Sequence, residues 1–108
     1  MEYLFVYGTL APGKKNEHIL ADVVGEWFPA IVHGELIAEG WGAAYDCSGI
    51  VLDDSKSPVE GLIFASNDLS HHWTMLDAFE GDEYQRVLTQ AITSDGDQLM
   101  ANIYVLNK

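Results

Sequence analysis

The first apolar stretch of the chain, Tyr3-Leu4-Phe5-Val6-Tyr7-Gly8-Thr9-Leu10, indicates how the fold begins. Aromatic and branched side chains dominate residues 3–7, a composition typical of a buried β-strand. Gly8 ends this run, and the Pro12-Gly13 pair shortly after it marks residues 9–15 as a loop. The sequence therefore predicts a buried N-terminal strand that leads directly into a glycine-containing turn.

The rest of the chain adds short strands and two helices. Strands are predicted over residues 27–32, 34–38, 50–52, 59–64, 84–93 and 99–106, with Gly34 as a bend or bulge and Asp95-Gly96 as a hairpin turn. A first helix is expected over residues 16–23, closed by Gly25, and a second from residue 67 or 68 to residue 79 or 80. Strands that outnumber helices indicate an α+β fold. In only 108 residues the sheet is expected to curl into a barrel, and we expect one domain, residues 1–108.

Composition limits the partners. Hydrophobic residues make up 48% of the chain, enough to bury a core, and 17 acidic against 5 basic residues give a net charge of -12. Such a charge repels phosphate backbones and anionic lipids, so neither nucleic acid nor membrane is an expected partner. No basic leader or long apolar span stands out, and a cytoplasmic location is expected. Cys47 is alone and His71 and His72 have no carboxylate at ligand spacing, so no metal site is expected.

One position breaks the pattern of the second helix. Leu69, Trp73 and Leu76 fall on one face of a 3.6-residue helix and form its apolar stripe. The next position of that stripe is Glu80, immediately before the helix-ending Gly81. The sequence therefore predicts a carboxylate at an inward-looking position.

The surroundings of Glu80 allow two interpretations. Burial, the negative end of the helix dipole and the acids Asp77, Asp82 and Glu83 would all raise its pKa, whereas Arg86 would lower it. A carboxyl group with a raised pKa is a better general base and acid at neutral pH. In the other interpretation, Glu80 turns to solvent at the end of the helix or pairs with Arg86.

The turn over residues 7–10 is a second candidate site. A glycine at a strand end lets backbone amides converge on an anionic oxygen, although strand-Gly-Thr turns also occur without function in many folds. Lys14 and Lys15 follow closely, either to attract an anionic substrate or as part of a solvated loop. The turn alone does not decide between these interpretations.

Together the motifs resemble one family. Tyr7-Gly8-Thr9-Leu10 after an N-terminal strand resembles the Tyr-Gly-Ser/Thr-Leu loop of the γ-glutamylcyclotransferase-like superfamily. Leu76-Asp77-Ala78-Phe79-Glu80-Gly81 with Tyr84-Gln85-Arg86 resembles its second motif, and Val59-Glu60-Gly61 a third. The similarity covers nearly the whole chain and is nearest to the γ-glutamylamine and AIG2-like branches. The segment Trp41-Gly42-Ala43-Ala44 departs from the family pattern in a region that shapes the pocket.

The resemblance implies a small mixed β-barrel with two short flanking helices and a cofactor-free reaction. A small γ-glutamyl compound would be cyclised to 5-oxoproline with release of an amine, Glu80 acting as acid and base. Tyr7, Gly8, Thr9 and Leu10 would bind the γ-glutamyl group, and Tyr84 would contribute to substrate binding. A non-catalytic ligand-binding module and an acidic interaction domain of the same fold are the alternatives. The leaving amine and the oligomeric state are not indicated by the sequence.

Overall fold

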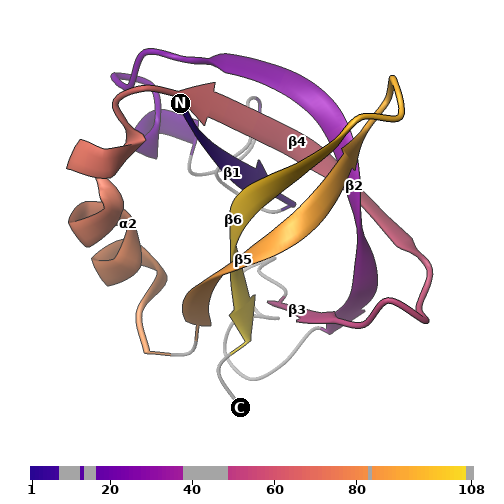
Figure 1. Cartoon of the computed structure of the whole chain (residues 1–108). Helices are drawn as coiled ribbons and strands as arrows, with labels where there is room; N and C mark the ends of the chain where they lie inside the picture. Colours follow the sequence, from indigo (N-terminus) through magenta and orange to yellow (C-terminus); the bar gives the residue numbers. More distant parts are fainter. Residues whose placement is uncertain (8–12, 14–16, 38–48, 83, 107–108) are drawn as a thin grey trace.

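The computed structural model describes residues 1–7, 13, 17–37, 49–82 and 84–106 (Figure 1). The helical elements are the α-helix α2 (Trp73–Glu80) and two 3-10 turns, η1 (Glu17–Ile19) and η2 (Leu69–His71). The strands are β1 (Glu2–Val6), β2 (Glu26–Ile37), β3 (Gly49–Leu52), β4 (Pro58–Ser66), β5 (Tyr84–Thr93) and β6 (Gln98–Leu106). Among these elements no helix is long and apolar enough to cross a membrane.

The strands form a closed barrel. They follow the order β3-β2-β4-β1-β6-β5, and β2 also pairs with β5, so that five of the described strands close into a barrel and β3 extends it. β1 runs parallel to β6, whereas the other pairings are antiparallel. The predicted α+β fold with a small mixed barrel is therefore confirmed.

β1 is buried on both faces, which explains its continuous apolar run. Phe5 belongs to the cluster inside the barrel, where it joins side chains from every other strand, among them Ile63 and Ile103. Leu4 and Val6 point the other way, into a second cluster. This second cluster also holds side chains from β4, β6 and the helical segments: Leu20, Val23, Phe64, Leu69, Leu76 and Tyr104. Alternation along β1 thus joins the barrel interior to the layer beneath α2.

The predicted helices differ in outcome. The second is confirmed as η2 followed by α2. The first shrinks to the 3-10 turn η1, because hydrogen bonds from the backbone N–H groups of Leu20 and Val23 reach back only three residues, to Glu17 and Leu20. These tight turns already bury Leu20 and Val23, so their apolar spacing needs no α-helix.

The strand predictions need one correction. The two segments expected around Gly34 form one continuous strand, β2, without a break in pairing. β2 pairs with β4 as far as His33 and with β3 from Gly34 onward, so the glycine marks a change of partner strand. The β5–β6 hairpin with its turn at Asp95-Gly96 is confirmed.

Candidate active site

Glu80 is the last residue of α2. The helix stops there because Gly81 adopts a φ of 80°, a left-handed conformation that favours glycine, and its N–H donates to the carbonyl of Asp77 over 3.1 Å. α2 lies along one side of the barrel and ends near the place where β5 begins and β6 ends (Figure 1). The helix end therefore brings Glu80 to this end of the barrel.

Burial dominates the chemistry of Glu80. It raises the pKa of the carboxyl group from 4.5 to about 7, and no other cause contributes resolvably, although the sequence suggested the helix dipole and neighbouring acids as well. Among the residues that the structure describes, no hydrogen bond or ion pair reaches this carboxylate. At neutral pH such a group can both accept and return a proton.

Two tyrosines lie close enough to Glu80 to feel its charge. Burial raises the pKa of Tyr7, and the neighbouring Tyr84 and Glu80 raise it further. Burial also raises the pKa of Tyr104, followed by its hydrogen bond to Asp77 and, more weakly, by the charge of Glu80. The structure therefore brings together three of the residues predicted for the site: Glu80, Tyr7 and Tyr84.

A chain of hydrogen bonds fixes the geometry around these groups. The Tyr7 hydroxyl donates to the backbone carbonyl of Tyr104 over 2.6 Å, and the Tyr104 hydroxyl donates to Asp77 Oδ1 over 2.6 Å. Arg86 donates two hydrogen bonds to the same carboxylate, from Nε to Oδ1 over 2.9 Å and from Nη2 to Oδ2 over 3.3 Å. The hydrogen bond from Arg86 is the main reason that the pKa of Asp77 lies below its usual value. α2 is thereby joined to β5, to β6 and to the end of β1.

Arg86 is also held from two further sides. Its Nη1 donates to Asn102 Oδ1 over 3.3 Å, and its guanidinium carbon lies 4.3 Å from the centre of a Trp73 ring. The interpretation of Glu80 as the ion-pair partner of Arg86 is therefore wrong, since Asp77 takes that place. The sequence indicated Asp77 only as one of the acids that would raise the pKa of Glu80 and did not single out Tyr104, although Asp77 and Arg86 both stand in the motif that resembles the family.

Part of the predicted site lies outside the described residues. Gly8, Thr9 and Leu10, which were expected to bind substrate through their amides, belong to this part, as do residues 14–16 and 38–48. Of the predicted site, the structure therefore describes Glu80, Tyr7 and Tyr84. The binding of an anionic oxygen by the backbone amides of residues 7–10 remains a prediction.

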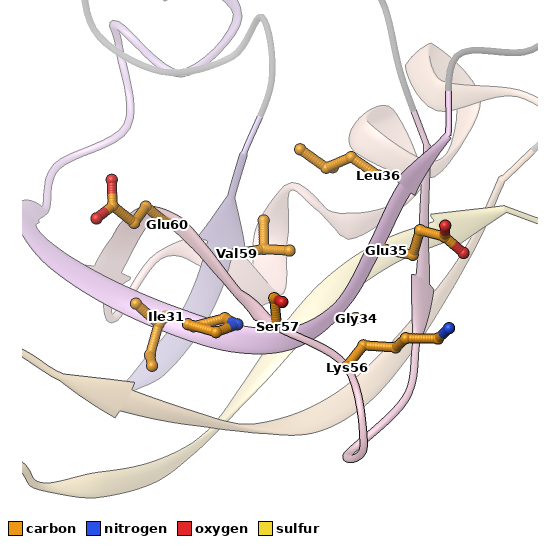
Figure 2. Close-up of a pocket in the computed structure, with 9 residues that line it drawn as sticks. Ile31, Gly34, Glu35, Leu36, Lys56, Ser57, Val59 and Glu60 are labelled. Atoms are coloured by element: carbon orange, nitrogen blue, oxygen red, sulfur yellow. The ribbon is translucent and has the colours of Figure 1, made fainter.

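A groove of about 700 Å³ lies elsewhere, between β2 and the turn that leads into β4. Figure 2 shows Lys56 and Glu35 at one end of it and Glu60 at the other. These three residues are exposed, unlike the buried polar groups that orient ligands in small-molecule sites. In Figure 1 α2 lies to the left of the barrel and the turn that leads into β4 lies to the right. None of the residues that line the groove belongs to α2, so the groove is separate from the Glu80 site. Among the described residues no group of three or more His, Cys, Asp or Glu could hold a metal ion.

Several solved structures share this fold. The Bacillus subtilis protein YkqA is 30% identical with a TM-score of 0.74, and the match covers 98% of this chain but 36% of YkqA. An AIG2-like protein from Mus musculus is 22% identical with a TM-score of 0.76, covering 97% of this chain and 76% of the mouse protein. An Arabidopsis thaliana protein is 27% identical with a TM-score of 0.71, and the match covers 97% of this chain and 61% of the Arabidopsis protein. The chain thus spans about a third of YkqA and a larger share of the others.

No curated protein matches the sequence significantly. A family model described as "Gamma-glutamyl cyclotransferase, AIG2-like" matches residues 4–108. This match includes both motifs that contribute Tyr7 and Glu80 to the site, and the structural neighbours have the same barrel. The chain therefore belongs to the AIG2-like γ-glutamyl cyclotransferase family.

Proposed function

We propose that this protein is a γ-glutamyl cyclotransferase that converts a small γ-glutamyl compound to 5-oxoproline and a free amine, with Glu80 as acid and base. One observation supports this most strongly: Glu80 is a largely buried carboxylate with a pKa near 7, next to Tyr7 of the first family motif. A solvated carboxylate at the end of a helix would keep a pKa near 4 and would be a poor base.

In the proposed reaction, the α-amino nitrogen of the substrate attacks its own γ-carbonyl carbon. Glu80 accepts one proton from that nitrogen as the new C–N bond forms. The same proton then passes from Glu80 to the nitrogen of the leaving amine as the original amide C–N bond breaks. The products are 5-oxoproline and the amine, and the carboxylate is regenerated without a cofactor.

Ring closure within one molecule places small demands on the protein, because the reacting groups are already close together. The protein must hold the γ-glutamyl group in a bent conformation and stabilise the negative charge on the γ-carbonyl oxygen. We assign this task to the backbone amides of residues 7–10. Tyr7 and Tyr84 would form a wall beside the substrate, since the Tyr7 hydroxyl is fixed by Tyr104 and Tyr84 lies next to it.

The proposal is tested by incubating the protein with γ-glutamyl amines, γ-glutamyl amino acids and glutathione and measuring released 5-oxoproline. The wild type should act on at least one compound. Glu80→Gln should lose at least 100-fold in rate, on the order of what general acid–base groups contribute. Glu26→Gln, the same change at an exposed position on β2, is the matched control and should keep full activity.

Two results would refute the proposal. The absence of 5-oxoproline across the whole panel would favour a binding module that holds a γ-glutamyl ligand without turnover. Full activity of Glu80→Gln would instead remove Glu80 from the chemistry while leaving the reaction in place.

A further inference from the structure

Asp77 occupies a special place relative to Glu80. It lies three residues earlier on α2, and residues with this spacing are neighbours on a helix surface, with Cβ atoms about 5–6 Å apart. Both are carboxylates, yet Arg86 donates two hydrogen bonds to Asp77 and none to Glu80. Arg86 therefore pairs with only one of two carboxylates that are neighbours on the helix surface.

Arg86 is restrained in favour of Asp77. The bond to Asn102 and the stacking on Trp73 hold the guanidinium from two sides, and Asn102 is itself anchored by donating to the carbonyl of Tyr3 over 3.2 Å. The Tyr104 hydroxyl donates to Asp77 from β6 and holds the other partner in place. These contacts orient the pair so that Arg86 neutralises Asp77.

We propose that Asp77 is a positioning residue that holds Arg86 and neutralises its charge, so that Arg86 does not become the cationic partner of the buried Glu80. The proposal rests on the proposed function, because the chemistry of Glu80 gives the arrangement its purpose. A guanidinium paired with Glu80 would stabilise its charged form and weaken it as a base.

Other titratable groups lie near Glu80 and remain unchanged in the test. Tyr7 at the end of β1 and Tyr104 on β6 interact with its charge, and Tyr84 on β5 interacts with Tyr7. Tyr7 and Tyr104 are neutral near pH 7, since the ordinary pKa of a phenol is about 10 and burial raises the pKa of both. Asp82 follows Glu80 by two residues and is exposed.

The test compares Asp77→Asn, Arg86→Gln, the double variant and Asp95→Asn. Asp77→Asn keeps an acceptor for Tyr104 but leaves Arg86 as an unpaired cation, so the Glu80 titration midpoint should fall by about one pH unit. Arg86→Gln leaves Asp77 as an unpaired anion, so the midpoint should rise by about half a unit or more. The double variant removes both charges and should return to the wild-type midpoint. Asp95→Asn changes the same charge in the distant β5–β6 turn and should shift nothing.

The midpoint is read by NMR from the 13C signal of the Glu80 carboxyl carbon, assigned by its loss in Glu80→Gln. This measurement needs no turnover, so it decides the role of Asp77 even if the panel of γ-glutamyl compounds shows no activity. Opposite shifts in the single variants, with restoration in the double variant, support the proposal. Unchanged midpoints, or shifts of the same sign in both single variants, overturn it. If Asp77→Asn does not fold, Arg86→Gln and the double variant still give this comparison.

Discussion

Replacing Glu80 by glutamine should make the protein more stable at pH 8, even though it abolishes the proposed activity. Burial raises the pKa of Glu80 from 4.5 to about 7, so the folded protein binds this proton more tightly than the unfolded chain does. The contribution of Glu80 to stability is therefore fully present below pH 4.5 and is lost as the pH rises to about 7. Glutamine has nearly the same shape as the protonated glutamic acid and never becomes charged.

The size of the effect follows from the pKa values. A rise from 4.5 to about 7 corresponds to about 3 kcal/mol between the fully protonated and fully ionised states. The side chain keeps some contact with solvent, and part of the change already occurs below pH 5. Between pH 5 and pH 8 we therefore expect the free energy of unfolding of Glu80→Gln to rise by about 2 kcal/mol relative to that of the wild type.

Urea unfolding of both proteins at pH 5 and pH 8 measures this gain. The decisive quantity is how much the difference in free energy of unfolding between the two proteins changes from pH 5 to pH 8. Other titrating groups affect both proteins alike. Glu26→Gln, at an exposed position, should show no such dependence on pH. A difference that stays constant between pH 5 and pH 8, or that favours the wild type at pH 8, would refute a raised pKa of Glu80.

Three further substitutions test the packing and hydrogen bonds around the site. Gly61→Ala should destabilise the barrel by about 1–3 kcal/mol in urea unfolding, since a Cβ at Gly61 would lie 2.5 Å from Phe5 Cζ; an unchanged midpoint would contradict this close approach. Leu76→Ala should cost about 2–5 kcal/mol in thermal or urea unfolding, because Leu76 is the fully buried residue by which α2 packs on the barrel; a loss below 1 kcal/mol would mean that α2 is not packed as described. Tyr104→Phe removes the donor to Asp77 and should cost about 1–2 kcal/mol while leaving the backbone carbonyl that binds Tyr7; equal stability would argue against this bond.

The apolar stripe of the second helix shows what the sequence could predict. Leu69 and Leu76 are both fully buried, and Glu80, the next position of the stripe, is largely buried as well. Leu69 lies in the 3-10 turn η2 and not in α2 itself, yet its burial follows the spacing. Periodicity reports which side of a segment faces the core and leaves the type of helix less determined.

The partner of Arg86 shows what the sequence could not predict. Spacing along one helix allows Arg86 to pair with Asp77 or with Glu80. Two residues on β6 favour Asp77, because the Tyr104 hydroxyl donates to Asp77 and Asn102 accepts a hydrogen bond from Arg86. Both contacts are long-range and depend on the barrel. The pairing of β2 with β5 that closes the barrel is equally long-range and is not encoded in any local pattern.

The central claim, that a buried Glu80 is the base of the cyclisation, is tested most directly by the pH dependence of kcat/KM for 5-oxoproline release. The acidic limb of this profile reports the pKa of the base in the free protein. For a substrate found in the panel, we predict a rate that rises with pH through a midpoint of about 7 in the wild type and through the same midpoint in Glu26→Gln. An acidic limb near 4.5, the ordinary pKa of a glutamate, or a profile without an acidic limb would contradict the account.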